Sequence, residues 1–461
     1  MLNYFNFKPF KDKYLITNDL GRFAFLTKEE MKELVTETLA PESELYQRLK
    51  ENYFLYEGSK YGFANRAGFE LREYKRYLYS PTGLHIFVVT KQCNQHCIYC
   101  QASASDGEKA VMNQETAKKA VDLALSSPSP FLTFEFQGGE PLMNFPIIKY
   151  MIEYATEHMG EKEIQFVVVT NLLLLTEEMA QFFLEYKVDI STSLDGDEEL
   201  HNHNRPWKGK NVYKKVDEKI TYLRQLGIQV SAIQTTTKYT LPRYKALVDT
   251  YIEKGMEQIF VRPLTQLGYA EKNWEHIGYT QEEFLAFYRN VLEYLIEKNK
   301  RGYFISEGHA VLFLNKLLGH DAGNYMELRS PCGAGVGQMA YYYDGNIYTC
   351  DEGRMLSEMG DKSFCIGNVN NSTWKSMIEH PVTKAVAKAS LLESNANCES
   401  CVYTPYCGTC PIISYAKKKQ LYPQMMGDYR CNIYQGMQEV IFEKLYENDE
   451  EIIQIFYRWI H

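Results

Sequence analysis

The chain has 461 residues, of which 45% are hydrophobic and 24% charged, and its formal net charge is −9. This composition excludes a disordered or fibrous protein, and the length predicts two or three domains. Lysine and arginine are scattered among acidic residues, so no basic stripe indicates nucleic-acid binding.

The N-terminal residues, MLNYFNFKPFKDKYL, contain neither the segments of a signal peptide nor an apolar run that would cross a bilayer. We therefore expect a cytoplasmic protein without a membrane partner. Thiols stay reduced in that compartment, so the eleven cysteines predict metal ligands, catalytic groups or buried residues rather than disulfides.

Residues 1–75 predict a small N-terminal module. Residues 13–27 alternate in hydrophobicity around Asn18-Asp19-Leu20-Gly21, which is typical of a β-hairpin. Thr27 begins a capping box for a helix to about residue 38, and residues 43–53 predict a second amphipathic helix. A hairpin followed by small helices predicts a winged-helix-like unit.

Strand and helix patterns alternate between about residues 80 and 310. Short, nearly continuous apolar runs predict strands buried on both faces at 84–90, 131–137, 164–170, 188–194, 228–234 and 258–264. Helices are predicted at 113–126, 146–159, 176–186, 212–226, 242–254 and 280–298. Six such units predict an α/β fold, a partial (β/α)6 TIM-like barrel with its chemistry at the carboxyl ends of the strands.

The region from about 325 to 435 has a different character. It contains the glycine-rich segment CGAGVGQ, a hairpin turn at residues 343–346 and eight cysteines. These features predict a domain organised by metal rather than by a large apolar core. Residues 436–461, within a pattern that begins near 433, predict one amphipathic C-terminal helix.

Three closely spaced cysteines, Cys93, Cys97 and Cys100, follow the first barrel strand. Thiolates bind zinc or iron–sulfur clusters, and a cubane cluster has four irons to ligate. Three ligands would therefore leave one iron open. The alternatives are a helical seam of buried cysteines, disfavoured by the polar residues between them, and a zinc site, disfavoured because no suitable fourth ligand is near.

Together with Tyr99, this triad resembles the C-x3-C-x-aromatic-C signature of radical S-adenosylmethionine (SAM) enzymes. The resemblance extends from about Leu84 to Cys431. It implies that the three cysteines hold a [4Fe-4S] cluster and that SAM binds at its open iron.

Further motifs support a SAM site. Residues 137–141, QGGEP, look like the family's GGE motif, which receives the amino group of SAM; glycines let backbone approach a ligand, and a carboxylate pairs with an ammonium. Asp195 either caps its loop or joins the site, whereas His201 and His203 are expected to form hydrogen bonds rather than bind metal. The resemblance implies SAM contacts at Tyr99, Gly138, Gly139, Glu140, Asn171, Ser193, Arg205 and Leu264.

The later cysteines resemble a SPASM domain with two auxiliary [4Fe-4S] clusters. The resemblance assigns Cys332, Cys350 and Cys410 to the first cluster and Cys398, Cys401, Cys407 and Cys431 to the second. The spacing before Cys410 is x2, where the family usually has x3. The first cluster lacks an obvious fourth ligand: Cys365 lies in FCIGNV, which favours a packed strand residue, and an open iron is the alternative.

The resemblance implies that a 5′-deoxyadenosyl radical abstracts hydrogen from a substrate. SPASM enzymes mostly modify peptides, and the N-terminal module resembles elements that bind a leader peptide, although a structural cap on the barrel is an alternative. The motifs are similar to those of maturases that install thioether or carbon–carbon cross-links, including the His-Xaa-Ser type. We expect cross-linking of a ribosomal precursor peptide, with reduced flavodoxin or a ferredoxin-type protein as electron donor.

Two other functions remain open. One is an anaerobic sulfatase-maturing enzyme that forms formylglycine, in which Asp351 would be the catalytic base. The other is an electron-carrying iron–sulfur protein, in which the GGEP segment and Arg205 would have no purpose.

Overall fold

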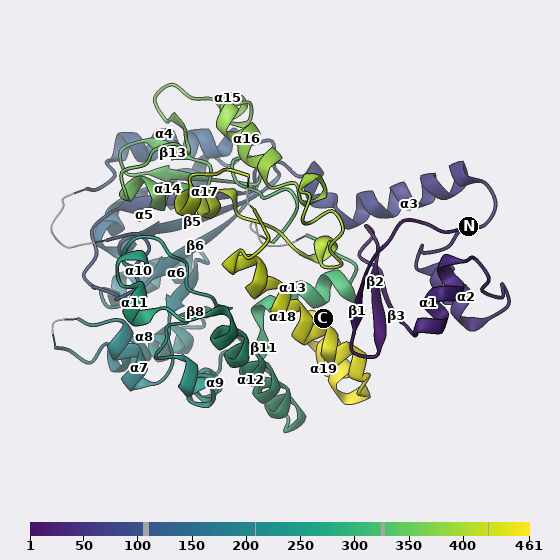
Figure 1. Cartoon of the computed structure of the whole chain (residues 1–461). Coiled ribbons are helices and arrows are strands. Elements are labelled where there is room, and N and C mark those ends of the chain that lie inside the picture. Colours follow the sequence, from purple (N-terminus) through teal and green to yellow (C-terminus); the bar gives the residue numbers. More distant parts are fainter. Residues whose placement is uncertain (105–109, 208, 324–327, 423) are drawn as a thin grey trace.

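The computed structural model describes residues 1–104, 110–207, 209–323, 328–422 and 424–461. A small N-terminal sheet with helices lies at one end of a larger α/β body, and the long helix α3 leads from one to the other (Figure 1). No helix in these residues is both long and apolar enough to cross a bilayer.

The N-terminal sheet is antiparallel, in the order β1-β2-β3. Its strands are β1 (Asn6–Phe10), β2 (Lys13–Thr17) and β3 (Phe23–Leu26). The predicted hairpin is confirmed as β2 and β3, while β1 was not predicted. The helices are α1 (Lys28–Val35), α2 (Glu44–Glu51), α3 (Lys60–Tyr74) and the 3-10 turn η1 (Arg76–Tyr79), and Thr27 forms the expected capping box of α1.

The main sheet has nine strands in the order β10-β8-β7-β6-β5-β4-β12-β13-β14. Six of these form the predicted parallel α/β partial barrel, namely β4 (Leu84–Thr90), β5 (Phe131–Gly138), β6 (Glu163–Thr170), β7 (Asp189–Ser193), β8 (Val230–Thr235) and β10 (Val261–Arg262). The last predicted strand, 258–264, is divided: β9 (Gln258–Ile259) pairs with β11 (Ser306–Glu307) instead of β8. The chain changes strand partner at Phe260, whose ring packs against His309.

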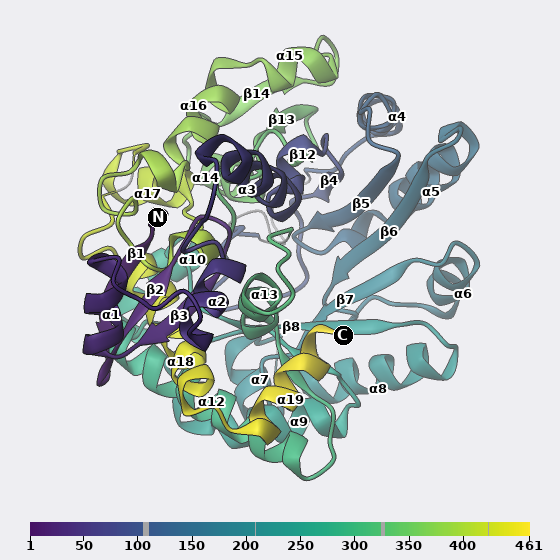
Figure 2. The same cartoon turned by 90° about the vertical axis from the view of Figure 1, so that its right-hand side faces the viewer.

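Helices surround the outer side of this fan of strands (Figure 2). Those predicted are α4 (Gln114–Leu125), α5 (Phe145–His158), α6 (Glu177–Glu185), α8 (Val212–Gln225), α9 (Tyr244–Glu253) and α12 (Gln281–Lys300). Those not predicted are α7 (Glu198–Asn204), α10 (Tyr269–Lys272), α11 (Trp274–Ile277), α13 (Gly308–Leu317) and the turns η2 (Pro141–Asn144) and η3 (Leu241–Arg243).

Burial on both strand faces, expected from the apolar runs, holds for β4 but not for β5. In β5 buried and half-buried residues alternate. Phe134 and Phe136 enter the apolar core under the helices, whereas Glu135 and Gln137 point to the inner side of the barrel and line a cavity there. The prediction was wrong for β5 because its run FLTFEFQ is an alternating pattern with large apolar residues on one side only.

The cysteine-rich region continues the barrel sheet. Strand β12 (Gln338–Tyr342) pairs in parallel with β4, and β13 (Asn346–Tyr348) and β14 (Cys365–Asn368) follow in antiparallel order, which confirms the hairpin turn at 343–346. The region is therefore tied to the barrel by strand pairing as well as by its cysteines. Its helices and 3-10 turns are α14 (Asp351–Glu358), α15 (Trp374–Ile378), α16 (Pro381–Ala389), η4 (Leu392–Ser394), η5 (Thr404–Tyr406) and α17 (Pro411–Lys418).

The C-terminal segment forms two helices, α18 (Tyr429–Glu447) and α19 (Glu450–Ile460), so the single helix predicted at 436–461 was wrong. Asn448 has φ 52°, a left-handed conformation that ends a helix and that asparagine tolerates. Asp449 then caps α19 by accepting hydrogen bonds from the backbone N–H of Glu451 at 2.9 Å and Ile452 at 3.2 Å.

Candidate functional site

The loop with Cys93, Cys97 and Cys100 lies at the carboxyl end of β4. Its backbone is bonded on three sides: Glu140 N–H donates to Gln92 O at 2.8 Å, Ile98 N–H donates to Asn204 O at 3.0 Å, and Tyr269 N–H donates to Cys100 O at 2.8 Å. Elements following β5, β7 and β10 thus fix one loop, because the carboxyl ends of parallel strands meet at one edge of the barrel.

The two glycines of the GGE segment allow this loop to approach. A Cβ at Gly139 would lie 2.2 Å from the carbonyl oxygen of Gln92, and one at Gly138 would lie 2.6 Å from that of Thr90. These glycines were predicted to let backbone approach a ligand. In the structure they also lie against the backbone of the cysteine loop, which leaves no room for a side chain at either position.

Glu140 is fully buried and accepts three hydrogen bonds. Thr170 Oγ1 donates to Oε1 at 2.6 Å, the backbone N–H of Asn171 donates to Oε2 at 2.7 Å, and that of Leu142 donates to Oε1 at 3.0 Å. Burial raises the pKa of Glu140 to about 7 against the opposing effect of these donors. Its carboxyl group therefore joins the ends of β5 and β6, in addition to any bond with a ligand.

A second buried network lies behind the cysteine loop. Asp195 accepts from Tyr99 Oη at 2.6 Å and from Arg205 Nε at 3.1 Å, and Arg205 also lies 5.2 Å from the centre of the Tyr99 ring. Arg205 Nη1 donates to Cys97 Sγ at 3.7 Å. Burial raises the pKa of the Cys97 thiol to about 12, and the Arg205 charge opposes that increase, so it favours the thiolate.

The remaining predicted contacts lie at the same edge of the barrel. Asn171 follows β6 and its Nδ2 donates to Asn94 Oδ1, in the cysteine loop, at 2.8 Å. Ser193 ends β7, and Leu264 follows β10 and is buried. His201 accepts from the backbone N–H of Asp195 through Nδ1 at 3.3 Å, in agreement with its predicted hydrogen-bonding role.

The inner faces of the strands enclose a cavity of about 1080 Å³. Gln137, directly before Gly138, lines it at one end of β5, and Cys332, Cys350 and Cys410 line it from the C-terminal region. Polar side chains from several strands also face it, including Glu135, Gln165, Ser191 and Arg262. Glu135, Gln165 and Ser191 were not predicted; for Glu135, the alternation of polar and aromatic residues in FLTFEFQ was the signal that could have revealed it.

Asp351 lies on the wall of this cavity, next to Cys350 at the start of α14. Its Oδ1 accepts from Arg354 Nε at 3.1 Å and from Arg354 Nη2. The other end of α14 reaches the first cysteine loop, where Lys91 Nζ lies 2.9 Å from Glu358 Oε2. Helix α14 therefore extends along the molecule from one cysteine group to another.

Charge interactions among the C-terminal thiols link Cys350 with Cys332 and Cys410, and Cys431 with Cys398, Cys401 and Cys407. Burial is the main cause of the raised pKa of Cys350, and the thiols of Cys410 and Cys332 raise it further. In the other set, burial raises the pKa of Cys398 to about 12 and that of Cys407 to about 11, and neighbouring thiols of the set contribute. Burial also raises the pKa of Cys431, and the thiols of Cys407, Cys398 and Cys401 raise it further.

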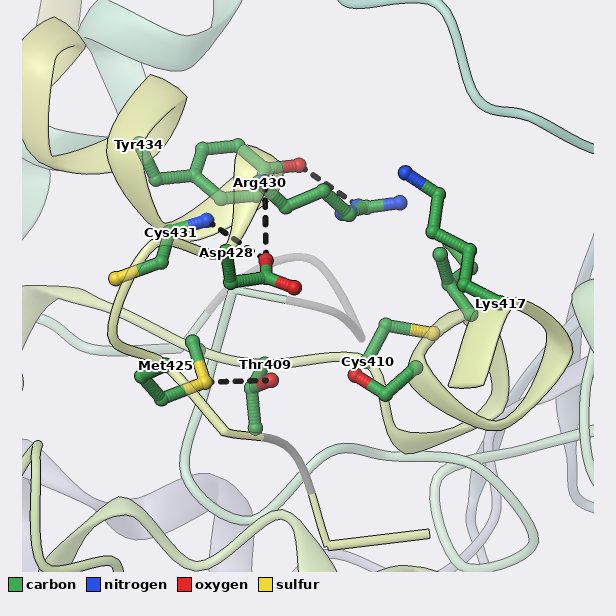
Figure 3. A pocket seen from close by; sticks show the side chains of 11 residues that line it. Thr409, Cys410, Lys417, Met425, Asp428, Arg430, Cys431 and Tyr434 are labelled. Atoms are coloured by element: carbon green, nitrogen blue, oxygen red, sulfur yellow. Dashed lines mark hydrogen bonds between the residues drawn. The ribbon is translucent and has the colours of Figure 1, made fainter. Parts of the chain in front are cut away.

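Cys410 and Cys431 line one small cavity, but their sulfur atoms point away from each other (Figure 3). The assignment of the two residues to different clusters stays a prediction. Cys365 lies on β14 and packs against an apolar cluster that includes Ile86 and Tyr348, as predicted for a strand residue.

Several donors are directed at the thiols. The backbone N–H of Gln95 donates to Cys93 Sγ at 3.4 Å, that of Gly353 to Cys350 Sγ at 3.4 Å, and Gln435 Nε2 to Cys401 Sγ at 3.6 Å. Such bonds suit thiolates that bind an iron–sulfur cluster, because N–H donors stabilise the negative charge on the ligating sulfur atoms. Over the described ranges, no three His, Cys, Asp or Glu side chains converge as they would around a single metal ion.

The N-terminal sheet contacts the loop that contains the second set. Thr17 Oγ1 donates to Val402 O at 2.8 Å, Asn6 Nδ2 donates to Cys401 O at 3.2 Å, and Tyr406 Oη donates to Gly21 O at 3.1 Å. These bonds place the N-terminal module directly against a predicted cluster.

Comparison with known proteins agrees with this geometry. Residues 87–244 match the family model of the Radical SAM superfamily, a range that contains the three cysteines, the GGE segment and Arg205. Over this range the chain resembles the Radical SAM superfamily.

The chain is 24% identical over 376 residues to the cysteine-type anaerobic sulfatase-maturating enzyme of Clostridium perfringens, covering 79% of this chain and 97% of that protein. Its fold resembles that of anSMEcpe with bound AdoMet, with a TM-score of 0.70 and 22% identity over 81% of this chain and all of that one. It also resembles Streptococcus suis SuiB bound to the precursor peptide SuiA, with a TM-score of 0.56 and 16% identity over 91% of this chain and 96% of that one.

Proposed function

We propose that this protein is a radical SAM enzyme that oxidises a ribosomal precursor peptide and installs a thioether or carbon–carbon cross-link in it. The observation that carries the proposal is the cavity of about 1080 Å³, whose walls hold polar side chains among apolar ones and which extends from Gln137, beside the GGE segment, to the thiols of the first C-terminal set. Such a space suits a peptide segment that must lie between a radical source and an electron acceptor.

In this proposal Cys93, Cys97 and Cys100 hold a [4Fe-4S] cluster, and SAM binds beside it. When bound, the two supply a 5′-deoxyadenosyl radical. The backbone of Gly138 and Gly139 and the carboxyl group of Glu140 receive the amino group of SAM, and Asn171, Ser193, Arg205 and Leu264 line the rest of its site. Tyr99 positions Arg205 through Asp195, which accepts hydrogen bonds from both residues.

Cross-link formation removes two hydrogen atoms from the peptide. One leaves as a hydrogen atom and the other as a proton with one electron. Asp351 lies on the cavity wall and accepts the proton, and its ion pair with Arg354 keeps the carboxylate oriented. The electron requires an iron–sulfur acceptor, for which Cys332, Cys350 and Cys410 lie on the same wall, with Cys398, Cys401, Cys407 and Cys431 as a second centre.

The N-terminal module is proposed to bind the leader part of the precursor. Its outer strands, β1 and β3, each offer an edge to which an extended peptide adds as a further strand. The likeness to SuiB supports this proposal, because SuiB has been solved with its precursor peptide and the alignment covers 91% of this chain. Reduced flavodoxin or a ferredoxin-type protein is the proposed electron donor.

The second candidate is maturation of a sulfatase by oxidation of a cysteine or serine to formylglycine. The sequence similarity to the C. perfringens enzyme and the position of Asp351 in the cavity favour it.

One experiment separates the two functions. The anaerobically reconstituted, reduced enzyme is incubated with SAM and either a full precursor, the same peptide without its leader, or a sulfatase-derived peptide. We expect loss of two hydrogens from the full precursor only, with a new linkage in its fragment spectrum. Formylglycine in the sulfatase peptide, with no change in the precursor, would overturn the proposal.

A further inference from the structure

Lys316, on α13, is a buried lysine close to the second C-terminal cysteine set. It is 1% exposed. Its Nζ donates to the backbone oxygen of Tyr406 at 2.9 Å and to that of Leu328. Tyr406 directly precedes Cys407, so the ammonium group lies against the loop that contains the cysteines.

No carboxylate pairs with Lys316 anywhere in the part of the chain that the structure describes. Burying an ammonium costs several kcal/mol unless an opposite charge is near. Burial lowers the pKa of Lys316 to about 7; the charge that opposes this effect belongs to Cys407, while Lys75 and Arg329 repel the ammonium.

Two other cations near the cysteines differ in this respect. Arg205, beside Cys97, forms an ion pair with Asp195 at 3.1 Å. The charge of Lys8 lowers the pKa of Cys401. Lys8 Nζ lies 3.5 Å from Glu439 Oε1, and the lysine side chain is 34% exposed. Among the charges that act on Lys316, that of Cys407 is therefore the one that favours the ammonium form.

We propose that Lys316 is the counter-cation of the second auxiliary centre and a positioning residue that raises the reduction potential of that centre. The inference rests on the proposed function, because it requires a cluster at Cys398, Cys401, Cys407 and Cys431. A cubane bound by four thiolates is an anion, and one-electron reduction makes it more negative. A fixed cation in a site of low dielectric constant favours the reduced form.

The test measures the reduction potential by electron paramagnetic resonance during a potentiometric titration of the reconstituted full-length enzyme. The signal that is missing from Cys401→Ala identifies the second auxiliary centre. Lys316→Met removes both charge and hydrogen bonds, Lys316→Gln removes the charge and keeps a donor, and Lys316→Arg keeps the charge.

Lys162 provides a matched control. Its Nζ also donates to two backbone oxygens, those of Ser127 at 2.7 Å and Ser129 at 2.8 Å, in the connections just before β5 and β6. Lys162→Met therefore removes a similar pair of hydrogen bonds without a cysteine group beside it.

We expect Lys316→Met and Lys316→Gln to lower the reduction potential of the second auxiliary centre by about 59 mV or more. For one electron, that shift corresponds to a tenfold change in the ratio of oxidised to reduced centre. Lys316→Arg and Lys162→Met should leave it unchanged. Loss of iron from the Met and Gln variants but not from Lys316→Arg would also support the role of charge.

An unchanged potential in Lys316→Gln, with the centre assembled, would overturn the inference. Equal loss of iron from all three Lys316 variants would do so too, because it would show that the shape of the site matters rather than its charge. A wild-type enzyme without any signal that depends on Cys401 would instead overturn the second auxiliary centre itself.

Discussion

Cys93, Cys97 and Cys100 follow a central strand, and backbone hydrogen bonds with Glu140, Asn204 and Tyr269 fix the backbone around them. Cys398, Cys401 and Cys407 come from a segment whose regular structure is one 3-10 turn, and that segment is bonded to the N-terminal sheet and to Lys316. The first loop is thus held by elements of the barrel, whereas the second is held by the N-terminal sheet and by Lys316. The difference shows that similar cysteine spacings can be supported in two physically different ways.

Cysteine substitutions should have the largest effect, because each should remove iron from one region and leave it in the other. Cys97→Ala should abolish formation of 5′-deoxyadenosine while most of the C-terminal iron stays bound, because the two regions hold their ligands independently. Iron content and deoxyadenosine yield, measured on the same anaerobic sample, test this prediction. Cys401→Ala is the matched variant and should lose C-terminal iron only; full SAM cleavage by Cys97→Ala would refute the assignment.

Gly139→Ala should destabilise the first loop strongly. The added Cβ would lie 2.2 Å from the oxygen of Gln92, so backbone must move, and we expect a loss of about 3 kcal/mol or more in the free energy of unfolding. Denaturant unfolding of the metal-free protein measures it. Gly68→Ala, in α3, meets no atom within 4 Å and should be neutral or stabilising by up to about 1 kcal/mol; equal effects would contradict the close approach.

Glu140 should make the stability of this loop depend on pH. Its pKa is raised from 4.5 to about 7 in the folded protein, so its contribution is complete below pH 4.5 and is lost as the pH rises through 7. The loss amounts to about 3 kcal/mol. Glu140→Gln, measured without SAM, should unfold with a smaller dependence on pH across this window; an identical pH profile would show that Glu140 does not titrate there.

The smallest effect concerns the contact between the N-terminal sheet and the second loop. Thr17→Val leaves the buried oxygen of Val402 without its donor, which costs about 1–3 kcal/mol. We expect faster loss of C-terminal iron to a chelator. Thr192→Val removes a similar bond, to Thr170 O at 3.0 Å inside the barrel, and should leave that rate unchanged; equal rates would mean that the N-terminal sheet does not support the second loop.

Local sequence patterns were sufficient for most of the barrel. Strand β4 and helices α4 and α8 lie within a residue or two of their predicted bounds, because period, capping residues and breakers act over a few neighbouring positions. The continuation of the C-terminal helix beyond Asn448 was predicted wrongly, since one left-handed residue does not interrupt the hydrophobic pattern.

The sequence by itself determined the α/β barrel, the first three cysteines and the GGE segment, because each depends on residues close together in the chain. Only the tertiary structure decided the pairing of β12 with β4, the opposite directions of Cys410 and Cys431, and the polar wall of the cavity. It also brought Lys316 to Tyr406, 90 residues away. Those features arise from contacts between distant segments, whose geometry no local spacing encodes.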